Sequence, residues 1–368
     1  MRIVKVNLGT RSYHIKVAPG LLSTLGAECA RLQFSSRCAV ITDGKVEPLY
    51  AKKACRSLKH AGFDPLLVSV PAGERAKSLK TVERCYNQFA AHRIERKSLV
   101  IALGGGVVGD LAGFIAATYL RGLPFVQVPT TLLAQVDSSV GGKTGVNLKA
   151  GKNLVGAFHQ PQLVLCDLDT LNTLPAREYR AGLAEVVKYG VIADRALFDR
   201  LEHTMPALLQ RNLALLAAVI ARCCEIKAQV VAEDETESGL RAILNFGHTV
   251  GHALEAISGY GKYLHGEAIS IGQVAAAQLS VDLLNLPAGD AARITSLLNA
   301  AGLPTRVKLN RAQKQRLLNA MRLDKKVSSG EIKFVLAREL GKVQFGCKVP
   351  LNALNRALTF PIIPPESP

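Results

Sequence analysis

The chain has 368 residues, which on average corresponds to about two domains of roughly 100–200 residues each. Hydrophobic residues make up 48% of it, which excludes a disordered chain, and no apolar run approaches the roughly 20 residues of a membrane span. The net charge is +17, but the basic residues are dispersed and tryptophan is absent. We therefore expect a basic surface with an anion-binding cleft, and neither a nucleic-acid partner nor a membrane.

The first half of the chain predicts alternating strands and helices. Its first residues alternate like a strand and lack the core of a signal peptide, so we expect a cytoplasmic protein. Apolar runs and helical periods predict further elements: strands at 38–43, 65–71, 98–103, 125–129 and 163–167, and helices at 46–60 and 78–92. Such alternation is typical of a largely parallel sheet that binds ligands at the carboxyl ends of its strands.

Helical periodicity replaces this alternation after Pro175. Residues 176–325 are rich in alanine and carry Leu, Ile and Val at three-to-four spacing, while small residues such as Gly272 permit close helix packing. A short strand pair is expected at 333–336 and 342–345.

The predicted fold class is therefore an α/β N-terminal domain, Rossmann-like with a mostly parallel sheet, plus an all-α C-terminal domain. We place the boundary near residue 175, with a cofactor-binding domain at 1–175 and a mainly helical metal- and substrate-binding domain at 176–368. The eight cysteines include no Cys-x-x-Cys pair, which favours reduced, mostly buried thiols over ligands or disulfides.

A glycine-rich turn at 104–109 follows a predicted strand and opens a predicted helix, in the pattern G-x-G-x-x-G. Such glycines let the backbone approach a pyrophosphate at the helix N-terminus. The acid that usually binds the ribose about 20 residues later is missing, and Asp43 or Glu74 could replace it. A turn without a ligand is the alternative.

Residues 137–144 come close to a P-loop, but Asp137 occupies the position of a required glycine and no strand directly precedes it. A nucleoside triphosphatase is therefore disfavoured. What remains is a glycine-rich loop with Lys143, followed by Lys152 and Asn153, and two lysines near glycine amides suit a phosphate. The alternative is a solvated loop.

Three of the eight histidines fall within residues 248–265. His248 and His252 are four residues apart, off the apolar face of a predicted helix, so spacing alone predicts both as metal ligands with His265 as the third. Glu185 and Lys188 are three residues apart on another helix. As an isolated pair they are expected to form a surface salt bridge.

Basic and amide side chains accompany the histidines: Lys227, Arg241 and Asn245. Imidazoles with a carboxylate suit a zinc-class metal, and neighbouring cations suit an anionic substrate. These residues therefore predict metal-assisted chemistry on a phosphorylated or carboxylated molecule.

Taken together, the motifs resemble the dehydroquinate synthases, a family of sugar phosphate cyclases. The resemblance runs almost end to end and is most specific at 129–147. Other matching segments are 73–77, 104–110, 121–122, 152–153, 184–190, 225–228, 245–249, 265–267 and 324–326. Departures such as Phe246 and Val250 are mild and touch no catalytic position.

The resemblance implies conversion of 3-deoxy-D-arabino-heptulosonate 7-phosphate to 3-dehydroquinate and phosphate, in the shikimate pathway of aromatic amino acid biosynthesis. The implied steps are transient oxidation by NAD, β-elimination of phosphate, re-reduction, and ring opening with aldol closure. NAD would be regenerated in each cycle. The enzyme would thus be a carbon–oxygen lyase that depends on NAD and on Zn²⁺ or Co²⁺.

The resemblance also implies a role for each matching residue. Its metal ligands are Glu185, His248 and His265, with His252 beside the metal and facing the substrate phosphate. Its cofactor contacts are Asp43, Gly73, Glu74, Lys77, Gly105, Gly106, Val107, Val108, Gly109, Asp110, Thr130, Thr131, Lys143, Lys152, Thr170, Leu171, Asn172 and Thr173. Its substrate-binding and catalytic residues are Asp137, Lys143, Asn153, Lys188, Lys227, Arg241, Asn245, His252, His265 and one of Lys325 or Lys326. Arg121 resembles an arginine that reaches the neighbouring subunit's substrate phosphate, which implies a homodimer.

Three alternatives stay open on the sequence. A cyclase that makes an inosose or a valiolone would share the NAD and metal parts, but would change the groups that bind the substrate carboxylate. An iron- or zinc-dependent alcohol dehydrogenase would consume NAD in each turnover. A nucleic-acid-binding protein rests on net charge alone, and its binding would depend strongly on salt.

Overall fold

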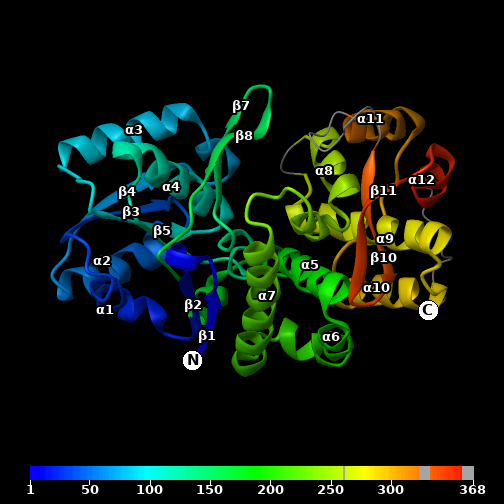
Figure 1. The fold of residues 1–368 in the computed structure, drawn as a ribbon, viewed down its shortest axis with the longest axis horizontal. Helices are drawn as coiled ribbons and strands as arrows, with labels where there is room; N and C mark the ends of the chain where they lie inside the picture. Colours follow the sequence, from blue (N-terminus) through cyan, green and yellow to red (C-terminus); the bar gives the residue numbers. More distant parts are fainter. Residues whose placement is uncertain (260–261, 323–331, 359–368) are drawn as a thin grey trace. The chain divides into compact units, whose positions relative to one another are not determined.

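The computed structural model describes residues 1–259, 262–322 and 332–358, which divide between two compact units (Figure 1). The first unit comprises Met1–Tyr179 with Arg211–Thr236, and the second comprises Arg180–Gln210 with Glu237–Pro368. The units are not two consecutive blocks of sequence, because helix α7 (Leu213–Glu233) packs against strands of the first unit. Lys325 and Lys326 lie outside the described residues.

The first unit is built on a seven-stranded sheet of order β1-β2-β9-β6-β5-β3-β4. Its strands are β1 (Arg2–Val6), β2 (Tyr13–Ala18), β3 (Arg37–Asp43), β4 (Asp64–Val70), β5 (Leu99–Gly104), β6 (Phe125–Pro129) and β9 (Leu163–Asp167). Only β1 and β2 pair in antiparallel fashion, and every other pairing in this sheet is parallel. The five strands predicted from apolar runs and the mostly parallel sheet are confirmed.

Helices cover both faces of this sheet (Figure 1): α1 (Leu25–Ala30) and α2 (Lys52–His60) on one, and α3 (Leu79–Ala91) and α4 (Gly106–Thr118) on the other. Alternate residues of β3 enter separate cores, as the two-residue period of a strand requires. Val40 joins the core that contains Leu58 of α2, whereas Ile41 joins the core that contains Phe89 and Leu111.

Residues 143–158 form a hairpin, so Lys143 and Lys152 lie on paired strands and not in the glycine-rich loop expected from the sequence. Strands β7 (Lys143–Leu148) and β8 (Gly151–Phe158) pair in antiparallel fashion, with Gly145 opposite Gly156. A side chain on either glycine would collide with the backbone of the opposite strand. Glycines are rare in strands, so the glycine content of this segment did not predict a hairpin. Here the two strands need the glycines to approach closely.

The second unit is mainly helical. Its helices are α5 (Ala176–Ala193, all but its first turn), α6 (Arg195–Leu209), α8 (His248–Ile257), α9 (His265–Leu284), α10 (Ala288–Ala300), α11 (Arg311–Arg322) and α12 (Leu351–Ala357). Helix α9 packs against α8, α10 and α12. The expected strand pair is confirmed as β10 (Lys333–Glu339) and β11 (Lys342–Lys348), and β10 also packs on α9.

Two further expectations concern the whole chain. All eight cysteines are free thiols and all but Cys55 are buried, as predicted. Among the described helices, none combines the length and apolar character needed to cross a bilayer.

Candidate metal centre and cofactor-binding residues

Two glycines of α9 allow three helices to meet closely. A Cβ on Gly266 would overlap the carbonyl oxygen of Ala181 in α5, and a Cβ on Gly272 would overlap that of Gly247, the residue before α8. Only glycine fits such contacts. The expectation that Gly272 permits close packing is confirmed. The two glycine contacts bring together the starts of α8 and α9 and the middle of α5.

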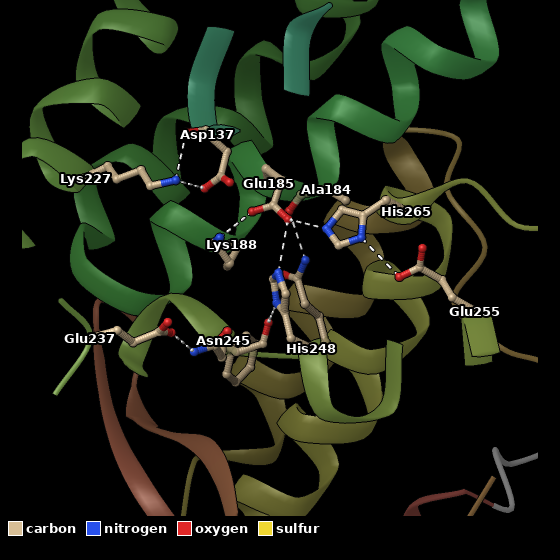
Figure 2. Close-up of polar contacts among 12 residues, drawn as sticks. Asp137, Ala184, Glu185, Lys188, Lys227, Glu237, Asn245, His248, Glu255 and His265 are labelled. Carbon is tan, nitrogen blue, oxygen red and sulfur yellow. Dashed lines mark hydrogen bonds and ion pairs between the residues drawn. The ribbon is translucent and has the colours of Figure 1, made fainter. Parts of the chain in front are cut away.

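The ligand candidates Glu185, His248 and His265 lie at this meeting point (Figure 2). Glu185 Oε1 is 3.5 Å from His248 Nε2 and 3.4 Å from His265 Nε2. Two ligands held tetrahedrally by zinc at about 2.0–2.1 Å are separated by about 3.3–3.4 Å. The two separations from Glu185 therefore match those of ligands around one ion.

The hydrogen bonds of the two Nδ1 atoms, which do not face Glu185, show that this site favours a cation. His248 Nδ1 is 3.1 Å from the carbonyl oxygen of Phe246, and His265 Nδ1 is 3.2 Å from Glu255 Oε2. A carbonyl or a carboxylate can only accept, so both Nδ1 atoms carry the proton and donate. In a neutral ring Nε2 then turns a lone pair toward Glu185 Oε1, a repulsive contact that a divalent metal would make attractive.

Without a metal, a proton on the ring of His265 can supply the positive charge beside Glu185. Burial lowers the pKa of His265, but hydrogen bonds and charges from Glu185 and Glu255 outweigh it and raise that pKa to about 10. The donor set of one carboxylate and two imidazoles thus favours a positive charge, as a zinc-class site does.

Glu185 also pairs with Lys188, and this pair is buried. Both side chains are 1% exposed, so the expected surface salt bridge is wrong. Residues 181–192 of α5 are buried on every side, which leaves no polar face to show which charges are solvated. A buried pair is costly to break, unlike an exposed one.

His252 lies beside the same centre. Its ring centroid is 5.2 Å from that of His248 and 5.8 Å from that of His265. The ring nitrogens of the three histidines can be chosen within 4.8 Å of one another. The all-histidine set predicted from spacing is therefore possible, and Glu185, 3.4–3.5 Å from two of these rings, is the competing third ligand.

Other predicted residues of the second unit lie on 3-10 helix η8 (Leu240–Asn245). Arg241 is buried, and Asn245 Nδ2 donates to Glu237 Oε1 at 3.1 Å. The sequence analysis missed both Glu237 and Glu255. The signal for Glu255 was its spacing of seven residues from His248, two turns along one helix.

In the first unit, the predicted cofactor and substrate residues form a hydrogen-bonded network. Lys77 is buried, and its Nζ donates to Asp110 Oδ2 at 2.6 Å and to Asn153 Oδ1, and lies 4.0 Å from Glu74 Oε1. Burial raises the pKa of Asp110, and the charge of Lys77 opposes that effect. The network joins three segments that are far apart in sequence.

Asn147 completes this network, although the sequence analysis gave it no role. Its backbone N–H donates to Lys77 O at 2.9 Å, its Nδ2 donates to Glu74 Oε1 at 2.8 Å, and its Oδ1 accepts from Asn153 N at 2.8 Å. Asn153 has a φ of 53°, a left-handed conformation that asparagine tolerates better than most residues. Asn147 therefore fixes the backbone of Asn153.

The glycine-rich turn joins β5 to α4, as predicted. A Cβ on Gly106 would lie 2.8 Å from Ser138 Oγ, and one on Gly109 would lie 2.7 Å from Gln127 Oε1. A side chain at either position would therefore have to displace the end of a neighbouring polar side chain. Val107, Val108 and Asp110 follow in the first turns of α4.

The other predicted cofactor contacts lie at strand ends. Asp43 ends β3, Thr130 and Thr131 follow β6, and 3-10 helix η7 (Leu168–Thr173) follows β9. Strands β9, β6, β5 and β3 are consecutive in the sheet and parallel, so their carboxyl ends share one edge. The sheet therefore brings these residues and the glycine-rich turn to the same edge.

The remaining charged residues of the first unit are scattered. Lys227 on α7 donates from Nζ to Asp137 O at 2.7 Å and lies 3.0 Å from Asp137 Oδ1 (Figure 2). Lys143 and Lys152 lie on the β7–β8 hairpin. Arg121 is exposed at the end of 3-10 helix η5 (Tyr119–Arg121), with a φ of 68°.

Comparison with known proteins shows the family of the chain. The family model described as 3-dehydroquinate synthase N-terminal matches residues 67–181, and the model described as 3-dehydroquinate synthase C-terminal matches residues 182–327. The 3-dehydroquinate synthase of Desulforamulus reducens is 50% identical over 343 residues, which are 93% of this chain and 95% of that protein.

Two solved structures share the fold over nearly their whole length. The first is 2-epi-5-epi-valiolone synthase from Streptomyces hygroscopicus subsp. jinggangensis with NAD⁺ and Zn²⁺ bound, at 28% identity and a TM-score of 0.87, covering 98% of each chain. The second is 2-deoxy-scyllo-inosose synthase complexed with carbaglucose-6-phosphate, NAD⁺ and Co²⁺, at 27% identity and a TM-score of 0.87, covering 97% of this chain and 99% of that one. By the family models and the 50% identity, the chain belongs to the 3-dehydroquinate synthase family.

Proposed function

We propose that this chain converts 3-deoxy-D-arabino-heptulosonate 7-phosphate to 3-dehydroquinate and phosphate, with recycled NAD and a Zn²⁺ or Co²⁺ ion. The observation that carries the metal part is the separation of 3.4–3.5 Å between Glu185 Oε1 and the Nε2 atoms of His248 and His265. Family membership carries the substrate. Relatives at 50% identity are 3-dehydroquinate synthases, whereas the valiolone and inosose synthases are 27–28% identical.

In the second unit, one carboxylate and two imidazoles would bind the metal, and cationic side chains would bind the anionic substrate. Glu185, His248 and His265 hold the ion, and three ligands leave a coordination position for substrate oxygens. Lys188 and Arg241 are buried cations that would bind the carboxylate or phosphate of the substrate. His252 stands beside the ligands and would meet the leaving phosphate.

The first unit supplies the cofactor contacts and further substrate contacts. The amides of the glycine-rich turn and of the α4 N-terminus suit a pyrophosphate, and Asp43 and Glu74 are the acids available to a ribose. Lys227, held by Asp137, and Asn153, held by Lys77, would bind substrate. When bound, a divalent ion lowers the pKa of a hydroxyl group that it polarises, and NAD accepts and returns a hydride.

An assay of phosphate release from the heptulosonate phosphate tests this function. We expect many turnovers with less NAD than substrate, loss of activity after treatment with a chelator, and recovery with Zn²⁺ or Co²⁺. Accumulation of NADH equal to product would instead identify a dehydrogenase. Phosphate release that is independent of both NAD and metal would overturn the proposal.

The same proposal includes a homodimer in which Arg121 binds the phosphate of the partner's substrate. Arg121 is exposed, and both it and the preceding Leu120 have a positive φ, a costly backbone conformation that is often found at functional sites. Arg121→Ala and His248→Ala should each be nearly inactive. Mixed dimers would contain one site with both lesions and one intact site, so up to about half of the activity should return. No recovery in verified heterodimers would place Arg121 in its own subunit's site.

A further inference from the structure

Glu255 makes a contact on the outer side of the proposed metal centre. It lies on α8, seven residues after His248, and its side chain is 13% exposed. Its Oε2 is 3.2 Å from His265 Nδ1, the ring nitrogen opposite the one that faces Glu185 (Figure 2). His265 is therefore held between two carboxylates, one at each ring nitrogen.

The two histidine ligands are supported differently. His248 Nδ1 donates to a neutral acceptor, the carbonyl oxygen of Phe246, at 3.1 Å. His265 Nδ1 faces the charged Glu255. A carboxylate fixes the proton on Nδ1 as a carbonyl does, but its negative charge also makes the opposite nitrogen a stronger electron donor.

We propose that Glu255 is a positioning residue that fixes the ring of His265 and strengthens its bond to the divalent metal. This inference rests on the proposed metal centre. It assigns Glu255 no contact with substrate, and it gives His265 a charged partner where His248 has a neutral one. The competing explanation is a salt bridge that only stabilises the packing of α8 on α9.

The test is the equilibrium affinity for Zn²⁺, measured by competition with a chromophoric chelator on the full chain. Glu255→Ala should bind Zn²⁺ about 10–100-fold more weakly than the wild-type protein, the usual effect of removing such a partner. Glu255→Gln keeps an acceptor of the same size without the charge, so its affinity should fall between the two. The visible spectrum of the Co²⁺-loaded protein should change in the same order.

Glu267→Gln is the matched control. The carboxylate of Glu267 accepts a hydrogen bond from Leu264 N at 2.9 Å and so caps helix α9. Glutamine can make the same capping bond, so this variant removes a charge near His265 and keeps the cap. The Zn²⁺ affinity of Glu267→Gln should stay within about twofold of the wild-type value, a much smaller change than the loss expected when the partner of a metal ligand is removed.

These measurements distinguish a failure of the proposed role of Glu255 from a failure of the proposed metal centre. Wild-type affinity in both Glu255 variants would overturn the role of Glu255 while leaving the metal centre intact. A similar loss in Glu267→Gln would also overturn it, because the effect would not be specific to the Nδ1 contact. Failure of the wild-type chain to bind one ion, or full binding by His248→Ala, would instead overturn the metal centre itself.

Discussion

The two groups of polar residues in this chain are built differently. In the second unit, Glu185 Oε1 lies 3.4–3.5 Å from one ring nitrogen of His248 and one of His265. In the first unit, Lys77, Asp110 and their neighbours hydrogen-bond to one another, and the glycine-rich turn packs against protein side chains. Side chains therefore define the proposed metal centre, whereas the proposed cofactor site combines backbone at strand ends with side chains that hydrogen-bond to one another.

Lys188→Met tests whether a metal shares the charge of Glu185, and we expect it to have the largest effect on stability. In metal-free protein the variant should lose about 3–5 kcal/mol, because Glu185 is left as a buried charge without its ammonium partner. Excess zinc should reduce this loss, since the ion would compensate the same carboxylate. Urea unfolding with and without zinc measures both values.

Arg222→Met is the control for this prediction. Arg222 and Glu225 have the same three-residue spacing and a separation of 3.1 Å, but their side chains are 46% and 48% exposed. Their loss should be about 0–1 kcal/mol with or without zinc. An equal loss for Lys188→Met in both conditions would argue against a metal on Glu185.

Gly272→Ala tests the packing that sets the ligand separations. The added methyl group would overlap Gly247 O, so we expect a loss of about 1–3 kcal/mol from overpacking. Because His248 follows Gly247, zinc affinity should also fall about tenfold, as when ligand support is disturbed. Gly289→Ala on α10 is the control, since its Cβ would meet nothing within 4 Å. Unchanged zinc affinity in a destabilised Gly272→Ala protein would break the link between packing and metal binding.

Asn147→Ala tests the first unit and should have the smallest effect on stability. Losing two side-chain hydrogen bonds should cost about 1–2 kcal/mol. Release of Asn153 from its left-handed conformation should raise the KM for the heptulosonate phosphate about tenfold, equal to about 1.4 kcal/mol. Zinc affinity should stay unchanged, and exposed Asn87→Ala should alter none of these values. Weaker zinc binding with a normal KM would contradict the separation of the two groups.

Local sequence patterns predicted most of the fold. The five apolar runs became strands β3, β4, β5, β6 and β9, because a buried parallel strand needs little more than a short β-branched run between turns. The β7–β8 hairpin escaped prediction because its glycines disfavour strands locally. The packing of α7 on the first unit depends on contacts with β1 and β2 that no local pattern encodes.

The candidate site was predictable in part. Spacing on α8 placed His248 and His252 on one side of a helix, and Gly272 was expected to permit close packing. Which helices meet at Gly266 and Gly272, and hence the approach of Glu185, appears only in the structure. The burial of Lys188 was hidden for a similar reason, since the central part of α5 is buried all round. Side chains brought together by tertiary packing were available only through the resemblance or the structure.

The zinc content of two variants tests most directly whether Glu185, rather than His252, completes the metal centre. Glu185→Gln and His252→Gln would be loaded with zinc, dialysed and analysed for metal per chain beside the wild-type protein. We expect His252→Gln to retain about one ion per chain and Glu185→Gln to lose it, because an uncharged amide is a poor zinc ligand. Retention by Glu185→Gln with loss by His252→Gln would contradict this account and establish the all-histidine site.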